Sequence, residues 1–203
     1  SLPPLFRSII HAAQLPLRER LDTLRAAAGK SREVFLGWFQ LGDELFHRGP
    51  LAGHRRAEAI PALERATRLR PDFGPAWEHL AWVATAEGDS ANAAAALDSL
   101  RTHSATPDAF SLAFRALLEI GFAWRFLPED AALRVTQQVT SAPAAQSSAN
   151  LGAGPRMLPT FEVPHGAIAL GEMLAHSPSR DLQRSGLIAQ TLTMLSLGRV
   201  DSA

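Results

Sequence analysis

Asp43, Glu44 and His47 are the side chains whose types and spacing first suggest chemistry, because they stand at i, i+1 and i+4 of one expected helix. A Glu-x-x-His helix can ligate a metal ion when a second such motif faces it. The neighbouring candidate, Glu78-His79, is an adjacent pair and does not repeat that spacing. We therefore interpret the first three residues as a polar patch, with His47 near a helix C-terminus where positive charge is favourable. The sequence predicts no metal site and no cofactor.

Nucleophilic catalysis is not indicated either. The chain contains no cysteine, which excludes thiolate nucleophiles, thiolate metal sites and disulfides. Serine, histidine and aspartate are present, but no G-x-S-x-G motif is found, the pattern that places a serine on the strand-to-helix turn of hydrolases. His165 and His176 have no carboxylate at a spacing typical of a catalytic pair. We expect that the chain is not an enzyme.

Basic residues gather in one part of the chain, where an acidic partner or a phosphate could bind. They are Arg48, His54, Arg55 and Arg56, followed by Arg65, Arg68 and Arg70. The chain as a whole has 20 basic and 20 acidic residues and a formal net charge of +0. A nucleic-acid-binding domain is normally strongly basic. We therefore interpret the cluster as solvated helix surface and expect no nucleic-acid partner.

Two tryptophans mark a repeat that would position these side chains. Trp38, Leu41, Gly42 and Leu45 fit the pattern W-x2-L-G-x2-Y, with Leu in place of Tyr. The matching second half of the pattern is Ala59, Leu63, Ala66 and Pro71, and the pattern restarts with Trp77, Leu80, Ala81, Gly88, Ala93, Leu97 and Leu100. This spacing resembles the tetratricopeptide (TPR) repeat, a helix–turn–helix unit of about 34 residues.

The resemblance implies an all-α fold, a right-handed solenoid of stacked antiparallel helix pairs with about nine or ten helices. We expect TPR-like repeats over residues 1–140, with the best-matched repeats at 35–71 and 74–107. Before the best-matched repeats, the sequence predicts a helix over 17–28 that ends at Gly29. Ser31 is then expected to cap a helix over 32–47.

The rest of the chain matches the repeat only in rhythm. Helices are expected from about 110 to 122 and from 128 to 139. Residues 141–164 are rich in Pro, Gly, Ser and Ala, which predicts a long loop or linker. A further helical hairpin is expected over 165–203, with helices at 166–175 and 179–197, and we expect the chain to stop inside a repeat of a longer protein.

The segment from Trp38 to Leu100 resembles the TPR regions of large bacterial signalling proteins, in which such repeats follow a Ser/Thr kinase domain or a DNA-binding output domain. The residues that carry this resemblance are Gly42–Leu51, followed by Leu63, Glu64, Arg65, Ala66, Pro71, Asp72, Phe73, Pro75, Ala76, His79 and Leu80. No Gly-rich phosphate loop, HRD or DFG motif is present. The resemblance therefore implies a module whose output lies elsewhere.

In TPR hairpins the first helix lines the concave face, so the resemblance also implies a binding surface. The residues placed there are Phe39, Asp43, Phe46, His47, Glu78, Trp82 and Thr85. Trp38 and Trp77 are expected instead to pack between helices. Where a carboxylate-clamp TPR domain has asparagines, this chain has Asp43 and Trp82. An apolar or mildly basic protein segment is therefore expected as partner, and a peptide C-terminal carboxylate is not.

The sequence thus predicts a non-catalytic protein–protein interaction module. Two alternatives stay open: a structural subunit of a multiprotein complex, and a sensory domain with a small ligand in a closed apolar pocket near the third hairpin. No apolar run of about 18 residues suggests a membrane span. No signal peptide is visible either, and a cytoplasmic location is expected.

Overall fold

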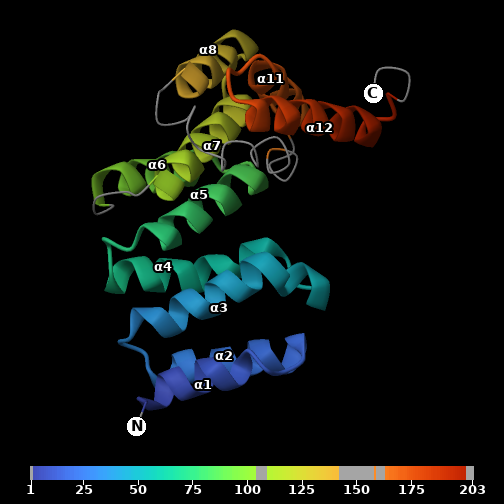
Figure 1. Cartoon of the computed structure of the whole chain (residues 1–203). Helices are drawn as coiled ribbons and strands as arrows, with labels where there is room; N and C mark the ends of the chain where they lie inside the picture. The colour runs from blue at the N-terminus through green and yellow to red at the C-terminus, as the bar shows by residue number, and fades with distance from the viewer. Residues whose placement is uncertain (1, 104–108, 142–157, 159–162, 200–203) are drawn as a thin grey trace. The chain divides into compact units, whose positions relative to one another are not determined.

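The computed structural model describes residues 2–103, 109–141, 158 and 163–199. These residues contain ten α-helices, two short 3-10 helices and no β-strand, so the predicted all-α class is confirmed. The chain divides into two compact units (Figure 1). The first comprises Ser1–Ala84 and Asp98–Ala105, and the second comprises Thr85–Leu97 and Thr106–Ala203. Most of the expected linker at 141–164 lies outside the described residues.

Helices joined by short turns make up the first unit, and neighbouring helices pack on one another (blue to green in Figure 1). They are α1 (Pro4–Ala12), α2 (Leu17–Lys30), α3 (Phe35–Arg48), η1 (Gly49–Ala52), η2 (Arg56–Ala59), α4 (Ile60–Leu69) and the greater part of α5 (Gly74–Glu87). The helix α6 (Ser90–His103) crosses the boundary between the units, and only its last residues belong to the first.

The boundary between α2 and α3 differs from its prediction. The helix α2 continues through Gly29 to Lys30, and α3 begins at Phe35 with Val34 as an N-cap that makes no side-chain hydrogen bond. One glycine in a helix costs only about 1 kcal/mol. Ala27 and Ala28 are buried beside it, and this packing keeps the last turn helical. The predictions that Gly29 ends the helix and that Ser31 caps the next one were wrong.

Trp38 and Trp77 play the same structural role in consecutive helix pairs. The indole N–H of Trp38 donates to the carbonyl of Arg32 at 3.0 Å, and that of Trp77 donates to the carbonyl of Pro71 at 2.8 Å. Each acceptor lies six residues before its tryptophan, in the turn that precedes the helix. Each indole is half-buried and secures the turn that leads into its own helix; the packing between helices expected from the sequence stays a prediction.

Gly42 allows α3 and α4 to approach closely. A Cβ atom at this position would lie 2.7 Å from Cγ and Cδ2 of Leu63, nearer than real atoms pack. Leu63 is fully buried. The glycine of the W-x2-L-G pattern is therefore required by the side chain that crosses over it.

The second unit is built around contacts of α11 with α7, α8 and α12 (Figure 1). Its helices include α7 (Ala109–Phe126), α8 (Glu129–Ser141), α11 (Pro164–Ala175) and α12 (Arg180–Ser196), which confirms the helices predicted in these stretches. The indole N–H of Trp124 on α7 donates to the hydroxyl of Thr136 on α8 at 2.9 Å. Gly166 at the start of α11 lies against the Trp124 ring, because an added Cβ would come within 2.7 Å of it.

None of the helices in the described parts of the chain combines the length and the apolar character needed to cross a membrane.

Candidate functional site

Aromatic rings and one histidine join α3 to α5. The His79 ring on α5 lies between two phenylalanines of α3, with ring centroids 5.8 Å from Phe39 and 4.8 Å from Phe46. Trp82 meets Phe46 edge-on at 5.0 Å, and Phe39 meets Phe73 at 4.7 Å. Edge-to-face pairs of this kind are favourable beyond the area they bury. They hold the His79 imidazole in one orientation.

Three potential ligand atoms converge at the solvent edge of this aromatic layer. The Nε2 atom of His79 lies 3.0 Å from Nε2 of His47 and 3.2 Å from Oδ1 of Asp43. The third side of the triangle, from His47 Nε2 to Asp43 Oδ1, measures 3.6 Å. Side-chain exposure is 11% for His79, 34% for Asp43 and 51% for His47. The cluster therefore has a buried base and an open side.

The protonation of His79 at Nδ1 is fixed by its own helix. Nδ1 lies 2.6 Å from the carbonyl oxygen of Pro75, one turn earlier. A carbonyl can only accept, so Nδ1 carries a proton and donates. Nε2 faces His47 and Asp43: it donates a hydrogen bond to the carboxylate when it is protonated and presents a lone pair when it is not.

Burial and neighbouring charges shift the pKa values of Asp43 and His47, the two accessible members of the cluster. Burial alone would raise the pKa of Asp43, but the hydrogen bond with His79 and the charges of His79, His47 and Arg48 outweigh it, so this pKa lies below 3.8. Burial lowers the pKa of His47 below 6.5, and His79, Arg48 and Arg56 add to this shift against the opposing charge of Asp43. At neutral pH the cluster is an ionised carboxylate beside a neutral His47 imidazole.

Glu44 belongs to a different arrangement, although the sequence placed it in the same polar patch. Its buried carboxylate accepts hydrogen bonds from Arg20 on α2 at 2.9 Å and from Arg48 at 2.9 and 3.0 Å. Arg20 also donates to the carbonyls of Ala13 and Leu15, in the turn between α1 and α2. Glu44 thus ties the first helix pair to α3, while Asp43 and His47 face α5.

The structure buries part of the expected binding surface and leaves the rest accessible. Phe39 (9% exposed), Phe46 (1%), Glu78 (6%) and Thr85 (1%) are buried. The expectation that Phe39 is exposed in a groove was wrong, because its ring packs against Phe73 and His79. Asp43 and Trp82 remain partly accessible and His47 is exposed. Three of the seven residues therefore reach the surface.

His79 is the residue that sequence reasoning missed. The pair Glu78-His79 was compared only with the Glu-x-x-His spacing on one helix. The structure instead adds His79 to the i, i+4 pair of the preceding repeat, Asp43 and His47. A comparison of each first helix with the first helix of the next repeat would have found it, because such helices face each other in a stacked array.

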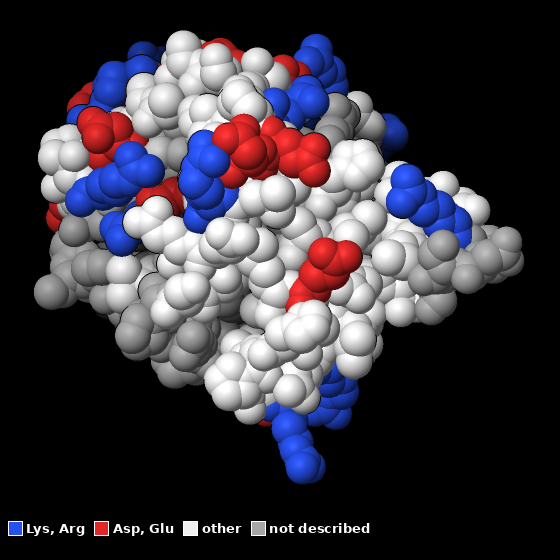
Figure 2. Space-filling model, turned by 90° about the horizontal axis from the view of Figure 1, so that it is seen from above, with Lys and Arg blue, Asp and Glu red and all other residues white. Residues whose placement is uncertain are grey.

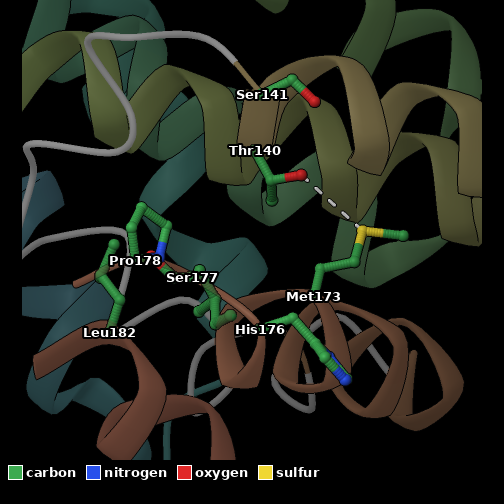
Figure 3. Close-up of a pocket in the computed structure, with 8 residues that line it drawn as sticks. Thr140, Ser141, Met173, His176, Ser177, Pro178 and Leu182 are labelled. Atoms are coloured by element: carbon green, nitrogen blue, oxygen red, sulfur yellow. Dashed lines mark hydrogen bonds between the residues drawn. The ribbon is translucent and has the colours of Figure 1, made fainter. Parts of the chain in front are cut away.

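A small cavity lies in the second unit, among α8, α11 and the turn before α12 (Figure 3). Its volume is about 180 Å³, and its lining is Thr140, Ser141, Met173, Leu174, His176, Ser177, Pro178 and Leu182. Figure 3 shows Thr140 and Met173 pointing toward each other, with 3.7 Å between the hydroxyl oxygen and the sulfur. Ligand sites usually enclose about 300–1,000 Å³, so this space suits a few water molecules. It is also partly polar, unlike the closed apolar pocket that the sensory hypothesis requires.

A stripe of exposed apolar side chains runs along α12. Leu187, Ile188, Leu192 and Leu195 are 46–56% exposed and follow the i, i+1, i+5, i+8 spacing of one helix face. A shallow hollow at its N-terminal end is lined by Arg180, Asp181, Gln183, Arg184, Leu187 and Ile188. In Figure 2, Lys and Arg side chains (blue) lie next to Asp and Glu side chains (red) on part of the face shown.

No family model matches the chain, and neither a curated protein nor a solved structure matches it. The geometry above is therefore the basis for the functional argument.

Proposed function

We propose that the chain is a non-catalytic protein–protein interaction module, a TPR-like solenoid within a larger bacterial regulatory protein. The observation that carries the proposal is the exposed apolar stripe of α12, formed by Leu187, Ile188, Leu192 and Leu195. Contiguous apolar surface on a soluble protein commonly marks an interaction site.

An amphipathic helix of a partner protein is the occupant that fits this stripe. The opposite face of α12 already packs on α11 as one member of a helical hairpin. Its exposed side chains form a ridge with helical spacing, and a second helix can bury such a ridge by placing its own side chains in the adjacent grooves. Burying a fully exposed leucine contributes about 1.5–3 kcal/mol. The four side chains are 46–56% exposed, so together they would contribute about 3–6 kcal/mol before the cost of association.

The concave face keeps a smaller part in this proposal. Asp43, His47 and Trp82 are the members of the expected surface that remain accessible. They remain a second candidate contact surface in the first unit, and the proposal for α12 does not depend on them. It retains an apolar or mildly basic segment as the expected partner.

The assembly alternative rests on a second stripe. Leu2, Phe6 and Ile10, at and before α1, are 42–53% exposed and follow the i, i+4, i+8 spacing. Each repeat of a solenoid contacts its neighbours, so an apolar face of this kind suits contact with another helical layer. A structural subunit would use this face for stacking in a complex.

Site-specific photo-crosslinking tests the proposal. A photoreactive phenylalanine analogue replaces Thr191, which lies beside Leu192 on α12, and the crosslinked peptides from a bacterial lysate are sequenced. We expect peptides with an apolar face at helical spacing. The synthetic peptide should then bind the parent chain, and Leu187→Glu/Leu192→Glu should weaken this binding about tenfold or more.

Leu51→Glu is the matched control, because Leu51 is 82% exposed on η1 and stands outside both stripes. It should leave the affinity unchanged. Equal loss of affinity in both variants, or crosslinks confined to copies of this chain, would contradict binding of a partner helix on α12. The second outcome would favour the assembly alternative.

A further inference from the structure

The cluster of Asp43, His47 and His79 goes beyond the proposed function, because nothing in an interaction module requires it. Among the described residues these three form the only group of His, Asp, Glu or Cys side chains with ligand atoms close enough for one metal ion. The atoms come from two helices, and all lie within 4.8 Å of one another. The expectation of a plain polar patch did not include His79.

We propose that Asp43, His47 and His79 form a binding site for a divalent transition-metal ion, with zinc as the best fit. Two imidazole nitrogens and one carboxylate oxygen are ligands that zinc prefers, and three protein ligands with one open position are typical of accessible zinc sites. Oxygen-only sites suit magnesium and calcium, so the two histidines argue against those ions.

The distances between the donor atoms match such an ion. Zinc lies about 2.0–2.1 Å from imidazole nitrogen and carboxylate oxygen, so two ligands of a tetrahedral ion are about 3.3 Å apart. The three observed separations are 3.0, 3.2 and 3.6 Å. An ion about 2.05 Å from all three atoms would lie about 0.8 Å out of their plane, close to the value for a regular tetrahedron. The cluster therefore needs little rearrangement.

Contacts behind His79 orient its ring for metal ligation. The Nδ1–H bond to the Pro75 carbonyl leaves the Nε2 lone pair of the neutral ring directed at the other two groups. Metal-bound histidines almost always have such an orienting partner. Phe39 and Phe46 also contact the ring in edge-to-face geometry.

Neighbouring charged groups act both for and against the binding of a cation at the site. The Nε2 atom of His79 lies 3.2 Å from Oδ1 of Asp43, so one cation can bind both atoms in place of the proton between them. Arg48 and Arg56 oppose a cation through their positive charge, but Arg48 is bound to Glu44. Because His47 is half-exposed, the fourth position of the ion is open to solvent. A water molecule or a partner's side chain would fill it.

Zinc titration by isothermal calorimetry tests the proposal on the full chain. We expect one equivalent of Zn²⁺ to bind with micromolar or tighter affinity. His47→Gln and Asp43→Asn should each weaken binding about tenfold or more, as loss of even an outer-shell partner costs about 10–100-fold. Both residues reach the surface, so the variants should keep the parent's circular dichroism spectrum. Co²⁺ should give the intense visible absorption of a tetrahedral ion.

His54→Gln is the matched control, because His54 also pairs with a carboxylate one turn away, Glu58, at 2.7 Å. It lacks a third ligand and should leave zinc affinity unchanged. The proposal is overturned if the parent shows no saturable binding at 100-fold excess zinc, or if His54→Gln weakens binding as much as His47→Gln. Either result leaves the α12 proposal intact, since that proposal rests on other residues in the other unit.

Discussion

Two sets of helix contacts, one in each unit, are held together by different means. In the first unit, charged side chains lie at the contacts between helices: Glu44 with Arg20 and Arg48, and Asp43 with two histidines. In the second unit, α11 and α12 meet at Gly171 and Gly186, where backbone touches backbone. The first kind of contact depends on the protonation of its side chains, and the second depends on shape. The proposed metal site accordingly lies in the first unit and not at the crossing of α11 and α12.

The largest expected effect is at that crossing. A Cβ atom at Gly186 would lie 2.5 Å from the carbonyl oxygen of Gly171 and 2.7 Å from the amide nitrogen of Ala175. Backbone atoms cannot rotate away, so Gly186→Ala must separate the two helices. We expect a loss of about 2–3 kcal/mol in the free energy of unfolding, measured by urea denaturation followed by circular dichroism.

Ser185→Ala is the control for Gly186→Ala, because Ser185 is the preceding residue and only half-buried. It should change the stability by less than about 0.5 kcal/mol. An unchanged urea midpoint for Gly186→Ala would mean that α11 and α12 do not meet at these glycines.

A smaller effect is expected for the charged contacts of the first unit. Glu44→Gln keeps the volume of the side chain but removes the charge that binds Arg20 and Arg48. Because this carboxylate is buried, we expect a loss of about 1–2 kcal/mol in the same urea experiment.

Glu64→Gln is the exposed counterpart of Glu44→Gln. Glu64 pairs with Arg68 across one turn at 3.5 Å, with both side chains more than half exposed. Exposed pairs of this kind contribute little, so its midpoint should not move. Equal losses for Glu44→Gln and Glu64→Gln would show that burial adds nothing at Glu44.

The difference between these contacts also explains which features the sequence could predict and which it could not. The W-x2-L-G pattern predicted helices at these positions; the Trp38 indole bonds to the turn before its helix, and Gly42 lies close against Leu63. The crossing of α11 and α12 could not be predicted, because Gly171 and Gly186 fit no local pattern and meet only in three dimensions. For the same reason the sequence assigned Phe39 to a groove: helical spacing says which face a ring is on, but not what covers that face.

Acid should destabilise the first unit in two steps. The pKa of His47 is below 6.5 in the folded chain, so between neutral pH and that lowered value the unfolded chain binds a proton that the folded chain does not. Stability is therefore lost as the pH falls below about 6.5. The pKa of Asp43 is below 3.8, so its contribution is present above about pH 4 and is lost on further acidification.

Thermal unfolding measured from pH 7 to pH 3 checks this prediction. The His47→Gln variant should lack the upper step, and Asp43→Asn should reduce the lower one. Asp43→Asn should not remove the lower step, because Glu58, Asp89 and Asp130 also have lowered pKa values. An identical upper step in the parent and in His47→Gln would show that another group causes it.

The smallest expected effect concerns two glycines in open surroundings. It distinguishes the influence of free space from that of backbone conformation. A Cβ atom at Gly29 would meet nothing within 4 Å, and the residue lies in α2. Gly29→Ala should therefore stabilise the chain by about 0.5–1 kcal/mol, because alanine is the better helix former. Gly53 has equally open surroundings but a φ of +87°, so Gly53→Ala should destabilise the chain by about 1 kcal/mol. If both substitutions shift the urea midpoint in the same direction, the left-handed φ of Gly53 does not determine the effect of the substitution. If they shift it in opposite directions, conformation decides the effect of a glycine in open surroundings, whereas contact decides it at Gly186.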